Sequence, residues 1–204
     1  MLGSRLGGVQ AGQSAGSLEP QVKGNAFRTI EHCFTELCGT AAREAALKLL
    51  SEPLRSSFEQ KVLLASSWYP ISWYRATFAA YREVQNAGPE LPREIGRRGV
   101  QRDMRAVYKQ LFLKMVSPQA LLGLSSRLFQ SYFDTGTMGI SESRGGHVRA
   151  TWTECRGWDE NLWAELAGSC EALLEMAGAK HVRLRVTHGG RNGDSACEME
   201  AHWV

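Results

Sequence analysis

The first two thirds of the chain repeat apolar residues at helical spacing. Phe27, Ile30, Phe34 and Leu37 recur every three or four residues, which is typical of a helix with one buried face. In the stretches that follow, proline and glycine residues mark where one predicted helix ends and the next begins. The sequence predicts about five helices in succession, the later ones near residues 53–65, 72–85, 91–115 and 118–133.

After residue 136 the apolar period changes to two. In the last segment Cys197, Met199, Ala201 and Trp203 share one side of an extended strand, and Glu198, Glu200 and His202 share the other. Asp159 caps a helix between two such hairpins, and Gly178 follows its end. The order is β-β-α-β-β. We therefore predict an α/β (α+β) fold: a helical half followed by an antiparallel sheet backed by a helix.

The chain has 204 residues, enough for one hydrophobic core. Residues 1–23 are rich in Gly, Ser, Gln and Ala and show no periodicity, so we expect a flexible tail and a single domain over 24–204. The tail is too polar for a signal peptide, and no apolar run is long enough to span a membrane. These features predict a cytoplasmic protein.

Five cysteines occur without a CxxC pair, which favours reduced, buried thiols over a disulfide frame. No set of Cys and His has zinc-finger spacing, so we expect no metal site. Cysteine catalysis would need a base beside the thiol. His202 lies on the face of its strand opposite to Cys197, and Cys170 lies on the inner stripe of its helix. We therefore expect no enzyme activity.

The net charge is +3, and opposite charges are segregated. Residues 91–114 contain seven Lys or Arg against two acids, and residues 154–175 contain six acids against one Arg. A basic stripe could contact nucleic acid, a membrane surface or a protein, but no base-stacking or groove-reading motif accompanies it, and nucleic acid is disfavoured. Pairing with the acidic helix of the same or a second chain is favoured. The candidate interaction residues in the stripe are Arg93, Arg97, Arg98, Arg102 and Arg105.

The segment WYPISWY at 68–74 has four large rings. Trp and Tyr are enriched at interface hot spots, and they also fill helix–helix joints. We assign Trp68 and Trp73 to a packed joint around Pro70, and we keep Tyr69 and Tyr74 as candidates for an interaction surface.

Three short motifs carry a family resemblance: Trp68-Tyr69-Pro70, LPREIGR at 91–97, and Gly193-Asp194 followed by Cys197 and Trp203. With the β-β-α-β-β order, the chain resembles the ligand-binding domains of nitric-oxide signalling and Golgi transport. These include four-vinyl-reductase-type domains and the Bet-three-like subunits of TRAPP tethers, and the resemblance is nearest to an uncharacterised group expanded in myxobacteria. It implies a homodimeric sensory or adaptor domain, as in bacterial signalling, that binds a small hydrophobic ligand or a partner protein.

The heme nitric-oxide-binding members of that superfamily hold heme through a proximal His and a Tyr-x-Ser-x-Arg element. This chain has no such element, so the resemblance implies no heme and no other cofactor. The alternative to a ligand-binding domain is a homodimeric interaction scaffold with a filled core. The candidate pocket residues between helices and sheet are Trp152, Leu166, Cys170, Val182, Leu184, Met199 and Trp203.

Overall fold

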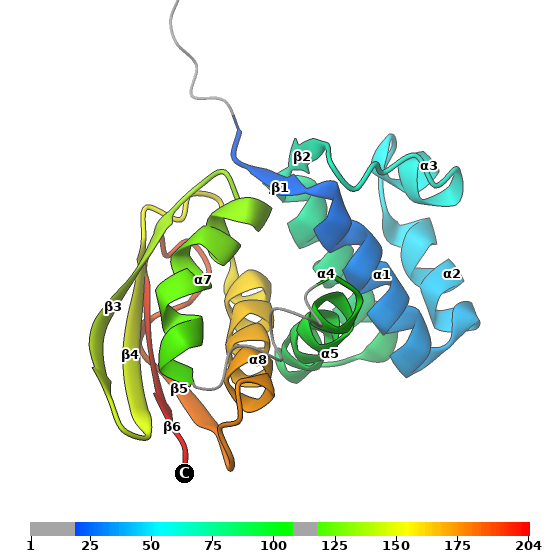
Figure 1. Cartoon of the computed structure of the whole chain (residues 1–204). Coiled ribbons are helices and arrows are strands. Elements are labelled where there is room, and N and C mark those ends of the chain that lie inside the picture. Colours follow the sequence, from blue (N-terminus) through cyan, green and yellow to red (C-terminus); the bar gives the residue numbers. More distant parts are fainter. Residues whose placement is uncertain (1–18, 108–117) are drawn as a thin grey trace, which may run out of the picture.

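The computed structural model describes residues 19–107 and 118–204 and divides into a helical half and a sheet half (Figure 1). The helical half contains α1 (Gly24–Cys38), α2 (Thr40–Leu49), α3 (Leu54–Glu59), α4 (Ile71–Gln85) and α5 (Glu90–Val107). The sheet half contains α7 (Pro118–Tyr132), β3 (Thr137–Arg144), β4 (His147–Thr153), α8 (Glu160–Met176), β5 (Arg183–Gly189) and β6 (Cys197–His202). The predicted fold class and the β-β-α-β-β order are confirmed.

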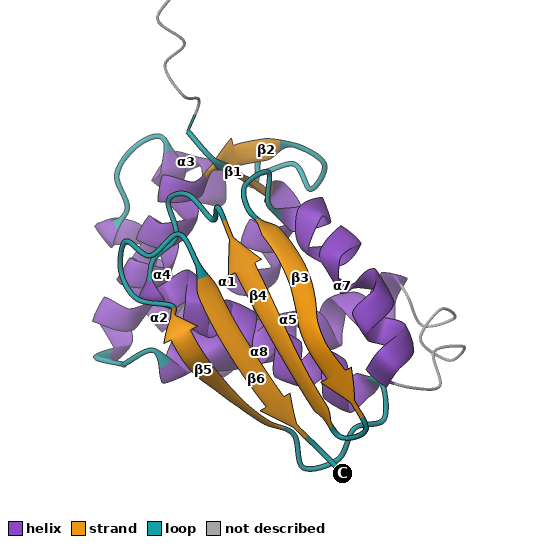
Figure 2. Cartoon of the chain, turned by 90° about the vertical axis from the view of Figure 1, so that its left-hand side faces the viewer, coloured by secondary structure: helices purple, strands orange, loops and turns teal. Residues whose placement is uncertain are grey.

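The four long strands form one antiparallel sheet in the order β3-β4-β6-β5. The α7 and α8 helices cover one face of this sheet, and the other face is open, as Figure 2 shows. The predicted alternation explains this arrangement. Ala150, Trp152 and Met199 are buried against the helices, while Arg149 and Arg185 lie on the open face.

Local sequence fixes the ends of α8 where the pattern predicts them. The Asp159 carboxylate accepts hydrogen bonds from the backbone N–H groups of Asn161 and Leu162. The rings of Trp158 and Trp163 pack against each other across this turn, with centroids 4.4 Å apart. Asp159 is therefore the N-cap of α8, and the two tryptophans form a hydrophobic staple beside it. Gly178 follows the helix with a positive φ of 97°.

The α5 and α8 helices pack at backbone distance, because glycines stand at the contact. A Cβ atom on Gly96 would lie 2.1 Å from the carbonyl oxygen of Glu165, and one on Gly168 would lie 1.9 Å from that of Arg93. Ion pairs join the same helices: Arg93 pairs with Glu171 at 2.6 Å, and Arg97 pairs with Glu175. The predicted pairing of the basic stripe with the acidic helix is confirmed within one chain for Arg93 and Arg97.

Two features of the helical half differ from the sequence prediction. Gln21–Lys23, which composition assigns to the tail, form strand β1 and pair with β2 (Trp68–Pro70). Such three-residue strands are too short to show a period. Tyr74 was expected on an interaction surface, but it is 1% exposed and packs edge-on against Phe27 and Phe78. It lies on the buried stripe of α4, so its assignment to a surface was wrong.

The core continues from the helical half into the sheet half. A smaller cluster under the end of the sheet contains Val148, Leu174, Ala179 and Ala201. No helix in the described ranges is both long and apolar enough to cross a membrane.

Candidate ligand-binding cavity

A cavity of about 110 Å³ lies where the helical half meets the sheet half. Its walls come from α1, α4 and α5 on one side and from α7, α8, β3 and β4 on the other. We call it the central cavity. The described apolar residues that line it include Ala26, Ile30, Ile95, Val100, Leu128, Phe129, Phe133, Met138, Trp152, Leu166 and Leu173.

Two carboxyl groups face the central cavity from opposite walls. On α5, Asp103 accepts hydrogen bonds from the Thr29 hydroxyl at 2.9 Å and the Tyr132 hydroxyl at 3.1 Å, and also from the Asn25 amide. On α8, Glu165 is half-buried and accepts a hydrogen bond from the Ser169 hydroxyl at 3.2 Å. Lys, Arg and His are absent from the described lining residues. The described wall is therefore apolar with an acidic side.

The pKa of the Glu165 carboxyl is raised to about 7, chiefly by burial and to a smaller extent by the Asp103 carboxylate nearby. The hydrogen bond from Ser169 opposes these effects. An ionised carboxylate is costly in an apolar surrounding, so the proton stays on Glu165 to a higher pH than in water. Near neutral pH this group can either donate or accept a hydrogen bond inside the cavity.

Four lining side chains belong to the types that ligate heme iron: Cys170, Met138, Tyr74 and Tyr132. Burial raises the pKa of the Cys170 thiol to about 12, and it raises the pKa of the Tyr74 hydroxyl well above its usual value. Both groups are therefore protonated near pH 7 unless a metal ion displaces the proton.

A second cavity of about 50 Å³ lies between α8 and the sheet and shares Trp152, Cys170 and Met138 with the central cavity. The residues predicted to line a pocket fall into four groups. Leu166 lines only the central cavity, and Leu184 and Met199 line only the second one. Trp152 and Cys170 line both cavities, whereas Val182 and Trp203 line neither and pack against the smaller core cluster.

Sequence reasoning placed the pocket between the helices and the sheet, but every residue it named came from the β-β-α-β-β segment, so it missed the contributions of α1, α4, α5 and α7. It also missed Glu165. The available signal was position: Glu165 immediately precedes Leu166 and lies one turn before Ser169, at the edge of the apolar stripe of α8. An acid at the edge of a buried stripe indicates a polar group turned toward the interior.

The other predicted surface residues whose side chains are described do not line the central cavity. Tyr69 is half-buried, and its hydroxyl accepts a hydrogen bond from the Leu64 N–H at 2.8 Å. Arg98 pairs with Glu94, and Arg102 contacts His32. The side chain of Arg105 lies outside the described residues.

The fold is similar to that of H-NOX proteins of known structure. An Fe(II) unliganded H-NOX protein from K. algicida matches with a TM-score of 0.68 at 10% identity, over 89% of this chain and 96% of that one. An oxygen-binding H-NOX domain related to soluble guanylate cyclases, in its oxygen complex, matches with a TM-score of 0.62 at 13% identity, over 89% and 94%. A protein described for the effect of porphyrin distortion on heme redox potential matches with a TM-score of 0.65 at 14% identity, over 88% and 99%.

The chain matches no protein-family model and no curated protein. Identities of 10–14% establish a shared fold and nothing more.

These neighbours correct two expectations. The resemblance to four-vinyl-reductase-type and TRAPP subunits was wrong, because the structural neighbours are H-NOX proteins; only the link to nitric-oxide signalling partly overlaps. The expectation of no heme is contradicted as well, because the proteins that share this fold are described with heme, Fe(II) or bound oxygen. That expectation rested on a missing sequence motif. At 10–14% identity a fold can be retained after such a motif has been lost.

Proposed function

We propose that this chain is a non-enzymatic sensory domain that binds a small, largely apolar ligand in the central cavity. The observation that carries the proposal is the cavity itself, which is lined by residues of both the helical half and the sheet half. An apolar cavity with a few convergent polar groups is the usual form of a small-molecule site. The similarity in fold to H-NOX proteins supports a sensory role.

The volume of the central cavity sets the size of the ligand. A cavity of roughly 150 Å³ lined by apolar side chains is known to bind benzene or xenon. The central cavity, at about 110 Å³, has a similar size, and the 50 Å³ cavity beside it shares part of its wall. We therefore expect a diatomic gas or a molecule near benzene in size, oriented by hydrogen bonds to Glu165 or Asp103.

Heme is the cofactor to test first, because the structural neighbours are described with it. The types of donor side chain fit: Cys170, Met138 and Tyr132 offer the sulfur and oxygen atoms that heme iron accepts. The volume is smaller than the roughly 300–1,000 Å³ typical of cofactor sites. Binding of heme would therefore require a wider cavity than the one described. Bound heme would supply an iron atom for gas ligands.

Signalling follows if the ligand binds one arrangement of the two halves better than the other. A ligand shifts a conformational equilibrium only by its difference in affinity for the two states. Here the contact between α5 and α8, with Gly96 and Gly168 at its centre, holds the two sides of the cavity together. A ligand that binds better when α5 and α8 are further apart would shift the equilibrium toward that arrangement.

Native mass spectrometry of the freshly purified full chain tests the proposal. We expect extra mass on the wild type. The Cys170→Phe variant, whose ring would fill the cavity, should lose this mass. An absorbance spectrum of the same samples identifies heme by its Soret band. Bare mass on the wild type, together with no binding of added hemin or benzene, would refute the proposal.

The competing function is a homodimeric interaction scaffold, and a homodimer is also compatible with a sensor. The scaffold alone predicts a bare mass, a stable dimer and full activity of the Cys170→Phe variant in partner binding. The same mass spectra therefore separate the two functions.

A further inference from the structure

A cluster of two histidines and a glutamate lies on the open face of the sheet, away from the central cavity. His147 on β4 pairs directly across from His202 on β6, and Glu200 lies two residues before His202 on the same face. The Nε2 atom of His147 is 2.9 Å from Oε1 of Glu200, and the Nε2 atom of His202 is 3.6 Å from that same oxygen. The two imidazole rings lie with their centroids 4.5 Å apart.

We propose that His147, Glu200 and His202 form a binding site for a divalent first-row transition metal ion of the zinc type. The three ligand atoms all lie within 4.8 Å of one another. A tetrahedral zinc ion with bonds of about 2.0–2.1 Å places its ligand atoms roughly 3.3–3.4 Å apart. The two measured separations from Oε1, 2.9 and 3.6 Å, lie on either side of that value, so small side-chain rotations would complete the site.

Neighbouring side chains hold the ligands as the outer partners of metal sites do. Arg185 binds the other carboxylate oxygen of Glu200, with its Nη2 and Nε atoms 2.6 and 2.9 Å from Oε2, and this leaves Oε1 directed at the histidines. The Nδ1 atom of His147 is 4.0 Å from a carboxylate oxygen of Glu142. The two hydrogen bonds from Arg185 orient the Glu200 carboxylate, as the outer partners of a metal ligand do.

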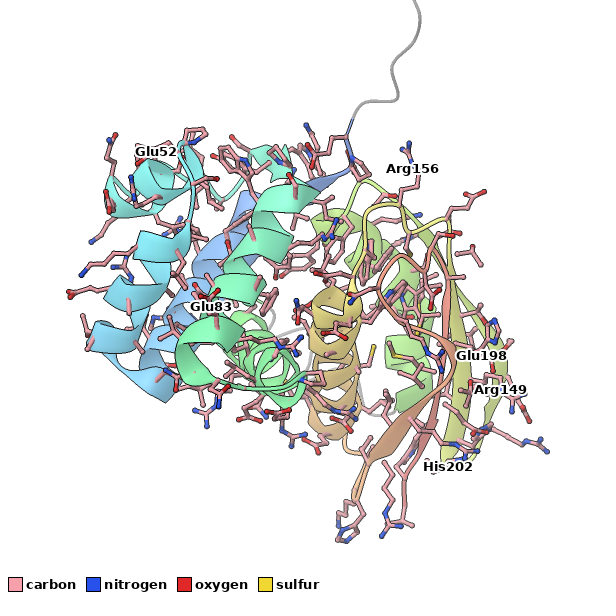
Figure 3. The ribbon with its side chains drawn as sticks, turned by 180° about the vertical axis from the view of Figure 1, so that it is seen from behind. Glu52, Glu83, Arg149, Arg156, Glu198 and His202 are labelled. Atoms are coloured by element: carbon pink, nitrogen blue, oxygen red, sulfur yellow. The ribbon has the colours of Figure 1, made fainter. Side chains whose placement is uncertain are left out.

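The charge around the cluster permits a cation. The Glu200 carboxylate supplies a negative charge beside both histidines, and the Glu142 carboxylate lies 4.0 Å from His147. Arg149 competes with the metal ion, because its Nη2 atom is 3.3 Å from Oε1 of Glu200. It also lies 3.6 Å from Glu142 and 3.7 Å from Glu198, and it can keep these two partners when the ion takes Oε1. Arg149 and Glu198 project from this side of the sheet in Figure 3.

The ligand set also indicates the metal. Two imidazoles and one carboxylate suit zinc, and the same donors accept cobalt, nickel and copper. Three protein ligands leave a fourth position open to water, and the exposure of His202, 56% of its side chain, leaves room for it. A metal ion here would join the start of β4 to the end of β6, near the C-terminus of the described chain.

Titration of the untagged full chain with zinc, followed by calorimetry, tests the site, and cobalt supplies a spectrum. We expect one ion per chain, and a cobalt spectrum typical of nitrogen and oxygen ligands without a thiolate charge-transfer band. His202→Asn and His147→Asn should each weaken binding by at least about tenfold, as loss of a ligand or its support does. Removal of the competing charge in Arg149→Gln should strengthen it.

His188→Asn is the matched control, because His188 is exposed on β5 and outside the cluster. It should leave the affinity unchanged. Equal losses of zinc affinity in His188→Asn and His202→Asn would overturn the proposal, and so would a thiolate band in the cobalt spectrum. A lack of binding at about 100 µM zinc would also overturn it, because this concentration is well above the dissociation constant expected of a protein zinc site. Circular dichroism confirms that each variant is folded, so every result bears on the site.

Discussion

Replacement of Glu165 by Gln should stabilise the protein by an amount that grows with pH. The carboxyl has a pKa near 4.5 when exposed and about 7 in the native cavity wall. A rise of about 2.5 units corresponds to about 3 kcal/mol, at about 1.4 kcal/mol per unit. Gln carries no charge at any pH, and its amide can still form a hydrogen bond with Ser169.

The sign follows from the direction of the shift. Below pH 4.5 the carboxyl is protonated in both states, and folding costs nothing extra. As the pH rises toward 7 the unfolded chain releases this proton while the native protein retains it, so the native state loses stability until the native carboxyl also ionises. The advantage of Glu165→Gln should therefore grow from about 1 kcal/mol at pH 5 to about 3 kcal/mol at pH 8.5.

Urea unfolding of both proteins at several pH values between 5 and 8.5 measures this difference. Glu83→Gln is the control, because Glu83 is exposed on α4 and should change stability by no more than about 0.5 kcal/mol at any pH. A difference between Glu165→Gln and the wild type that stays constant across this range would show that Glu165 is not held in an apolar wall.

Three further predictions concern the frame around the cavity. Gly96→Ala should lower the free energy of unfolding by about 1–3 kcal/mol, because the new Cβ would press on a backbone oxygen of α8. Thermal melting measures this loss against the control Gly139→Ala, whose new Cβ would have no neighbour within 4 Å. Asp159→Ala should cost about 1 kcal/mol in chemical unfolding through loss of the cap of α8, and a cost near zero would show that the cap is not needed. With a thiol reagent at pH 8, Cys38 should react before the buried thiols of Cys33, Cys155 and Cys197. Burial raises the pKa of these three thiols to about 11 or 12. Equally fast reaction of the buried thiols would contradict this prediction.

The sheet half could be predicted from sequence because its signals are local. The alternation in β6 and the cap at Asp159 each specify their own element. A helix and four strands with one apolar face each can bury those faces only against one another. The pairing of Arg93 with Glu171 could likewise be anticipated from the segregation of charge along the chain.

The central cavity could not be predicted because its walls come from segments far apart in sequence. Ile30 and Glu165 line the same space, yet nothing local to either residue shows this. Tyr74 illustrates the same limit: an aromatic residue in a ring-rich segment fits a surface or a core equally well until its neighbours are known. The sequence resemblance reached nitric-oxide signalling but not the H-NOX proteins themselves, whose likeness to this chain, at 10–14% identity, is one of fold.

A crystal structure of the freshly purified protein, determined without added ligand, would test the central claim most directly. We predict electron density in the space between Trp152, Glu165 and Cys170, either for a small molecule or for a porphyrin in a widened cavity. Ordered water alone in that space, with the walls in the same positions and unchanged after soaking with hemin or benzene, would contradict a ligand-binding function.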